Sequence, residues 1–199
     1  MKKAILVLIV FHVTFFSVTA QIGRPDTVTA ADIYGFLNAT RNPFNTIRMG
    51  KLCNPDSVKI SNLFSYPEYN SLREDTTEIF KDTALFSKAD KAFIKRQMAR
   101  NKHFVWKDGE IKGVHVINGS KVLYLFDSLT PKKAWNAYYS IYKVGYNKFS
   151  VPLFSLDKKR CIVYRSYSCS QVYSLGNTNV YEYTNNRWII VKSCSPWIH

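Results

Sequence analysis

The sequence is poor in acidic residues, in cysteine and in motifs typical of catalytic sites. Its 199 residues hold 14 Asp and Glu against 28 Lys and Arg, with four cysteines and eight glycines. It contains no C-x-x-C pair, no H-E-x-x-H, no G-x-S-x-G and no glycine-rich phosphate loop. These absences argue against zinc ribbons, zinc proteases, serine hydrolases and P-loop enzymes. We therefore expect neither a metal nor a cofactor.

Long apolar runs are also scarce, and the one that stands out lies near the first residue. Two lysines precede the apolar segment 4–16, and small residues follow it up to Ala20. This order is typical of a secretory signal peptide, residues 1–20, cleaved between Ala20 and Gln21. The run is shorter than the roughly 20 residues that cross a bilayer, and no later segment is as apolar. The sequence predicts an exported, soluble protein, periplasmic or extracellular, with no transmembrane segment in the mature chain.

The mature chain, 21–199, has the length of a single domain. Its part 21–83 is predicted to be loop-rich, since Asn-Pro and Tyr-Pro pairs interrupt it and 68–82 is acidic without clear periodicity. Charge is uneven along the chain: 21–90 holds eight Lys/Arg and nine Asp/Glu, whereas 91–199 holds eighteen and five, a net of +13. This asymmetry suggests an anionic polymer or surface as partner, although a purely solubilising charge is the plainer interpretation.

Helices are predicted over 30–38 and from Lys88 to about Lys102. Ser87 is a suitable N-cap for the second, with Asp90 three residues later. At 100° per residue, Phe93 and Ile94 share the packed side with Asp90 and Gln97. We interpret the two polar residues as structural, one capping its helix and the other bonding loop backbone. The opposite side carries a possible anion-binding stripe of Lys88, Lys91, Lys95 and Lys102.

The middle of the chain predicts a hairpin and a third helix. Asn118-Gly119 suits a two-residue turn between strands 114–117 and 122–125. Thr130-Pro131 suits the start of a helix. An aromatic face follows on this helix, which we interpret as core: Trp135, Tyr138, Tyr139 and Tyr142.

The C-terminal fifty residues predict an antiparallel meander. Tight turns are expected at Asp157-Lys158 and Asn185-Asn186, and a longer loop around Gly176. The run from Trp188 to Val191 is apolar on both faces, so the last strand should be an inner or covered one. The expected strands lie near 149–154, 159–168, 178–184 and 187–193. The predicted fold class is α+β, with two or three helices packed on a C-terminal meander of four or more strands.

Several short motifs follow one another along the second half of the chain: Asp90-x-x-Phe93-Ile94-x-x-Gln97, Trp106, Trp135 with Tyr138-Tyr139, Ser150-x-Pro152-x-Phe154, and Arg187-Trp188. Their order resembles a group of small exported bacterial proteins of unassigned function. The likeness covers about residues 84–198 and implies the α+β fold and export, but no catalytic residue. Cys169 and Gly176 keep two positions of a loop motif of that group, whose second cysteine is Tyr173 here.

The four cysteines allow three connectivities if all of them pair in an oxidising compartment. Cys161 and Cys169 would lie roughly 26 Å apart on one extended strand, beyond bridging distance. Cys169 and Cys194 finish alternate strands at the same end of the meander. The geometry favours a Cys169–Cys194 disulfide, with Cys161 a buried thiol.

Three functions remain open from the sequence. A non-enzymatic binding or envelope-associated module suits the basic, tyrosine-rich second half. A small basic hydrolase such as a ribonuclease could use His103 and His115 as acid and base, although their spacing matches no known nuclease motif. A partner or inhibitor of another exported protein is the third. We favour the binding module.

Overall fold

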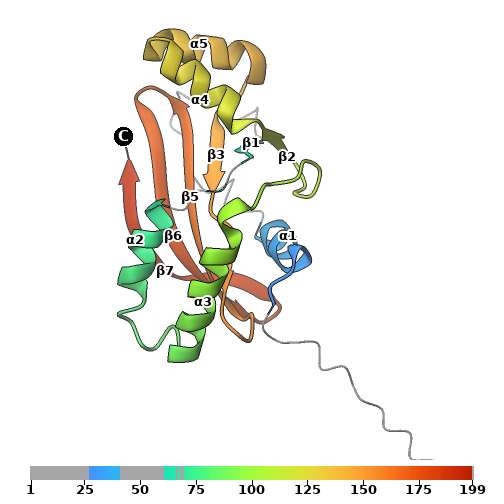
Figure 1. Ribbon diagram of the computed structural model, residues 1–199, viewed down its shortest axis with the longest axis vertical. Coiled ribbons are helices and arrows are strands. Elements are labelled where there is room, and N and C mark those ends of the chain that lie inside the picture. The colour runs from blue at the N-terminus through green and yellow to red at the C-terminus, as the bar shows by residue number, and fades with distance from the viewer. Residues whose placement is uncertain (1–26, 41–60, 66, 68–69, 199) are drawn as a thin grey trace, which may run out of the picture.

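The computed structural model describes residues 27–40, 61–65, 67 and 70–198, and its fold is α+β, as the sequence predicts. The predicted signal peptide and its cleavage site at Ala20 and Gln21 lie outside the described residues. Within them the chain forms five α-helices and one mixed seven-stranded sheet (Figure 1).

The helices and strands follow one another in an order that places most strands last. The helices are α1 (Ala30–Ala39), α2 (Asn70–Ile79), α3 (Lys88–Arg100), the short 3₁₀ helix η3 (Asn101–His103), α4 (Gly119–Ser128) and α5 (Pro131–Tyr142). The strands are β1 (Ser61–Phe64), β2 (Val114–Ile117), β3 (Tyr146–Phe149), β4 (Leu153–Phe154), β5 (Arg160–Ser170), β6 (Tyr173–Thr184) and β7 (Arg187–Ile198).

The sheet has the strand order β2-β1-β3-β5-β6-β7, and β4 pairs with β5 outside this path. β1 is parallel to β2 and β3, whereas β3, β5, β6 and β7 pair antiparallel in turn. The predicted meander is confirmed. Both predicted tight turns are present, with positive φ at Lys158, Asn185 and Asn186, a region of backbone space that asparagine enters more readily than most residues.

Helices cover both faces of the meander. Successive residues of a strand point to opposite faces, so two neighbouring residues of β5 show what covers each face. Val163 of β5 belongs to one apolar cluster with residues of α1 and with Phe93 of α3. Its neighbour Ile162 belongs to a second cluster with residues of α2 and with Ile94 of α3. A third cluster under α4 and α5 contains the fully buried Tyr138, so the predicted aromatic face is core.

The polar residues on the packed side of α3 have the structural roles that the sequence predicts. Ser87 and Asp90 form a capping box at its start. Asp90 also accepts a hydrogen bond from the backbone N–H of Leu156, at 2.9 Å. Gln97, 2 % exposed, brackets the backbone of Phe154: its Nε2 donates to the carbonyl at 2.7 Å, and its Oε1 accepts from the N–H at 2.9 Å. These bonds fix β4 against α3.

The predicted hairpin over 114–125 is wrong. β2 pairs in parallel with β1, and Asn118 is the N-cap of α4, its side chain accepting from the N–H of Lys121. A Cβ on Gly119 would lie 3.2 Å from the Phe64 ring, so glycine allows the start of α4 to pack closely on β1. The Asn-Gly pair therefore begins a helix here instead of closing a turn.

The helix α2 was missed in the stretch predicted to be loop-rich. Leu72 and Ile79 are fully buried on one side of it, at the spacing of two helical turns. Between them, Asp75 and Thr76 also face inward, and Asp75 accepts a hydrogen bond from the hydroxyl of Thr178 in β6. Polar residues at core-facing positions hid the apolar periodicity.

The last two strands differ from prediction in two respects. Gly176 lies within β6 rather than in a loop, and a Cβ there would come 2.7 Å from the Trp197 ring. β7 is the edge strand, with Ile190 and Val191 50 % and 39 % exposed, so the prediction of an inner or covered strand is wrong. Trp188 is half-buried, with its ring centroid 4.9 Å from that of Phe36.

The predicted Cys169–Cys194 disulfide is not formed, because Cys194 has a free thiol. Cys194 pairs with Thr178 in the middle of the sheet, whereas Cys169 lies near the β5–β6 turn. The longer strands separate the two positions. Cys161 is a buried free thiol, as predicted, and burial raises its pKa.

Candidate functional site

The candidate site is built on the loop that joins η3 to β2. Gly109 and Gly113 adopt φ angles of +83° and +67°, which side-chain-bearing residues rarely do, and the loop folds back along β2. Asp108 thereby reaches two residues of β2: its Oδ1 accepts from the N–H of Val116 at 2.8 Å, and its Oδ2 lies 3.1 Å from Nδ1 of His115.

The helix α1 holds the other side of this loop. The side-chain amide of Asn38 donates to the carbonyl of Glu110 at 2.9 Å and accepts from the N–H of Lys112 at 2.9 Å. The loop between Asp108 and β2 is thus tied to the body of the protein at both of its sides, which gives His115 a defined position.

The charge state of the Asp108 carboxyl follows from its contacts. The N–H of Val116 and the neighbouring His115 together hold the pKa of the Asp108 carboxyl below its usual range. Asp108 is therefore a carboxylate that only accepts, so Nδ1 of His115 carries the proton of their hydrogen bond. Nε2 of His115 makes no hydrogen bond within the described residues, and the two side chains are each 55 % exposed.

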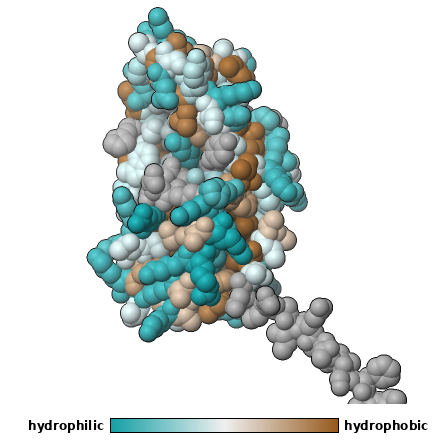
Figure 2. Space-filling model, in the orientation of Figure 1, coloured by the Kyte–Doolittle hydropathy of each residue, from teal (hydrophilic) through white to brown (hydrophobic). Residues whose placement is uncertain are grey.

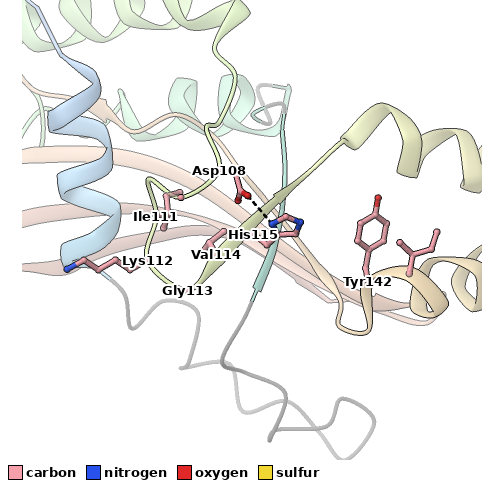
Figure 3. A pocket seen from close by; sticks show the side chains of 9 residues that line it. Asp108, Ile111, Lys112, Gly113, Val114, His115 and Tyr142 are labelled. Carbon is pink, nitrogen blue, oxygen red and sulfur yellow. Dashed lines mark hydrogen bonds and ion pairs between the residues drawn. The ribbon is translucent and has the colours of Figure 1, made fainter.

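A hollow of about 660 Å³ opens beside this pair. In Figure 3, Lys112 lies on one side of Asp108 and His115, and Tyr142 of α5 on the other. The other lining residues are apolar or glycine, so the charged side chains of this hollow are few. Its residues are Asp108, Gly109, Ile111, Lys112, Gly113, Val114, His115, Ile141 and Tyr142.

A second hollow of about 460 Å³ adjoins the first, because both are lined by Ile141 and Tyr142. Its further lining comes from the first turns of α4: Asn118, Ser120, Lys121, Tyr124 and Leu125. We call the two hollows together the concave strip. Tyr124 and Ile141 are 70 % and 60 % exposed, so the strip offers open apolar surface as well as lysines.

The predicted lysine stripe is only partly an open surface. Lys88, Lys95 and Lys102 are exposed, and Figure 2 shows hydrophilic side chains over this part of the molecule. Lys91 is half-buried: its Nζ donates to the carbonyl of Phe80 at 2.6 Å and lies 5.9 Å from the centre of that ring. Lys91 thus joins α3 to the end of α2, and none of the four lines the concave strip.

The predicted pair of histidines is not brought together in the strip. His115 lines it, whereas His103 is exposed at the end of η3 and lines neither hollow. Asp108 was missed from the sequence, since its role depends on the fold of the loop. Within the described ranges, no three His, Cys, Asp or Glu side chains are grouped so that they could hold a metal ion.

Comparisons with protein family models, with characterised proteins and with solved structures find no match to this chain. The resemblance drawn from the motif order therefore stays a prediction. Among the helices that the structure describes, none has the length and apolar character needed to cross a membrane.

Proposed function

We propose that this protein binds an extended anionic ligand along the concave strip, without converting it. The observation that carries the proposal is the position of His115. Asp108 occupies Nδ1 of the imidazole, and Nε2 is left without a hydrogen-bond partner in the described residues, beside a hollow of about 660 Å³. A protonated imidazole in this orientation presents one N–H donor to a bound phosphate, sulfate or carboxylate.

The charge of the strip supports an anionic ligand. Lys112 and Lys121 stand in the first and second hollow, and neither makes an ion pair with another described residue. Asp108 is the acid that lines the strip, and the N–H of Val116 and His115 already satisfy it. The two lysines are spaced along the strip rather than clustered, which suits a ligand with several negative groups.

The apolar part of the strip indicates that the ligand has flat or ring-shaped units. Tyr124 and Ile141 are largely exposed, and Tyr142 joins the two hollows. Aromatic side chains beside basic ones bind sugar rings or bases of acidic polymers by stacking while the cations neutralise their charge. Export is predicted from residues 1–20, so we propose that the ligand is met in the periplasm or outside the cell.

The test compares binding of heparin, single-stranded RNA and polyphosphate at several salt concentrations. We expect the Lys112→Gln/Lys121→Gln variant to bind its preferred ligand roughly tenfold more weakly and with a smaller salt slope, because fewer counterions are released. The matched control is Lys88→Gln/Lys95→Gln, which removes the same charge from exposed positions of α3. Equal losses in both variants, or equal weak binding of all three polymers, would show unspecific attraction.

A hydrolase is the second candidate, because a carboxylate that orients an imidazole also prepares it to act as a general base. The same assay decides between the two functions by following the length of the RNA. Turnover that is lost in His115→Ala would replace the binding proposal with the enzymatic one. We expect no turnover, and His103→Ala should change neither binding nor RNA length, since His103 lines neither hollow.

A further inference from the structure

The helix α4 is apolar around most of its circumference, although it lies at the surface. Its sequence, GSKVLYLFDS, contains one lysine and one aspartate. Val122 is fully buried toward the aromatic cluster, while Leu123 and Tyr124 on the outer side are 48 % and 70 % exposed. Helices that are apolar on every side are usually enclosed by protein or lipid. The outer side of α4 has no such cover in the described part of the chain.

The hairpin of α4 and α5 is the helical part of the molecule that exposes large apolar side chains. Of the ten that are exposed in the described residues, four lie between 119 and 142, and five lie between 172 and 198, in and beside the edge strand β7. None lies on α1, α2 or α3, which pack their apolar residues inward. The four are Leu123, Tyr124, Leu129 and Ile141. Grouped on one helical hairpin, these four side chains form a candidate interaction surface.

Positive charge surrounds this apolar surface. Lys121, Lys132 and Lys133 are exposed and make no ion pair with other described residues, and Asp127 is the one acid between 119 and 142. Leucine and tyrosine with a rim of lysines match the interface of an anionic bilayer, where apolar groups enter between headgroups and lysines meet phosphates.

We propose that the outer face of the α4–α5 hairpin docks onto an anionic membrane surface. Figure 1 shows α4 and α5 together at one end of the molecule, beyond strands β3, β5 and β6, so this end can approach a flat surface first. The helices lie on the bilayer and do not cross it. This inference goes beyond anion binding in the concave strip and uses Leu123, Leu129, Lys132 and Lys133, which do not line the strip.

The first experiment measures binding to vesicles of phosphatidylglycerol and phosphatidylcholine, and to vesicles of phosphatidylcholine alone. We expect Lys132→Gln/Lys133→Gln to bind the anionic vesicles roughly 10- to 30-fold more weakly, from the attraction of about two surface lysines. The matched control Lys88→Gln/Lys95→Gln should lose less than about threefold. The apolar segment 4–16 adds the same background to every variant of the full chain. Equal losses in the two variants overturn the proposal.

The second experiment locates the contact directly. Leu123→Trp places a reporter on α4, and Ile190→Trp places one on β7 at a residue of nearly equal exposure, 48 % against 50 %. With nitroxide-labelled lipid in anionic vesicles, fluorescence should be quenched more in Leu123→Trp than in Ile190→Trp. Equal quenching contradicts docking by this face, and so does self-association that Leu123→Ser abolishes, since a second copy would then cover it. Neither reporter lines the concave strip, so failure of the proposed function leaves this result unchanged.

Discussion

The charged side chains on and beside α1, α2 and α3 differ in their contacts from those on α4 and α5. Four acids around the first three helices are engaged: Asp32 pairs with Lys158 at 2.8 Å and Asp82 with Lys192 at 3.0 Å, while Asp90 and Asp75 accept hydrogen bonds from the sheet and its turns. The hairpin of α4 and α5 has one acid, Asp127, and its exposed lysines make no ion pair among the described residues.

This difference separates the part of the molecule that stabilises the fold from a part whose lysines remain open to solvent. Around the meander, polar groups link helices to strands, and the large apolar groups of α1, α2 and α3 are covered, whereas the edge strand β7 exposes Ile190 and Val191. Around the hairpin and the loop before β2, lysines, tyrosines and leucines remain open to solvent. Open groups add little to the stability of the free protein, so their composition is better explained by something that they contact.

The largest effect should follow from Phe93→Ala in α3. Phe93 is 1 % exposed and packs against the first apolar cluster. We expect a loss of about 3–5 kcal/mol in the free energy of unfolding, from lost burial and the cavity left behind. Urea melts measure it, with Lys95→Ala as an exposed control on the same helix. A loss below about 1 kcal/mol would mean that α3 does not join the two clusters.

A smaller loss is expected from Gln97→Leu, which keeps an apolar volume but removes the amide. The N–H and carbonyl of Phe154 would then be buried without their present partners. Each buried group left unsatisfied costs about 1–3 kcal/mol, and we expect about 2–4 kcal/mol in total. Urea melts measure this loss, and the loss in Phe93→Ala is the reference with which it is compared. A neutral result would show that β4 finds other partners, and that the bonds around the meander are dispensable.

The pH dependence of the stability of Asp90→Asn tests the hydrogen bond between α3 and the turn before β5. Burial by itself raises the pKa of Asp90, but hydrogen bonds from Ser87 and from the N–H of Leu156 outweigh it and hold the pKa below its usual range. A depressed pKa in the folded state gives stability that is present above about pH 4, the unfolded value, and is lost as the pH falls through the folded one. We expect Asp90→Asn to cost about 1–2 kcal/mol at pH 7.

The difference between the variant and the wild type should narrow as the pH falls below about 4, because protonation removes the same charge from the wild type. Thermal melts between pH 7 and pH 2.5 measure it. The control is Asp127→Asn on α4, where the carboxylate makes no hydrogen bond with described residues. A gap that stays constant with pH would contradict the role of the ionised carboxylate.

The sequence predicted those features of the fold that depend on residues close together in the chain, such as helix caps. The cap of α3 depends on Ser87 and on Asp90 three residues later, and the structure has this capping box. Asn118-Gly119 is equally local but ambiguous, since asparagine serves both a hairpin turn and a helix start. The outcome depends on β1, which precedes β2 by about fifty residues and pairs with it. Local sequence contains no signal for that pairing.

The candidate site shows the same limit. His115 was identified by its residue type, but its predicted partner was His103, whereas the observed partner is Asp108. The backbone turns at Gly109 and Gly113 bring that carboxylate back to β2, and no periodicity encodes their direction. The lysine stripe was predicted from helical spacing alone, whereas Lys91 bonds the carbonyl of Phe80, a residue from another segment.

The smallest effect on stability should come from Leu123→Ser on α4. Leu123 is 48 % exposed, and a substitution at an open position away from caps and core usually changes the free energy of unfolding by less than about 0.5 kcal/mol. The adjacent residue provides the contrast: Val122 is fully buried, so Val122→Ser should cost about 2 kcal/mol or more, from lost burial and a buried hydroxyl. Urea melts of both variants measure the difference. If Leu123→Ser proved as costly as Val122→Ser, its side chain would belong to the fold, and the hairpin would be no more open than the rest of the molecule. If its melt is unchanged, any binding that Leu123→Ser loses reflects a contact made outside the chain.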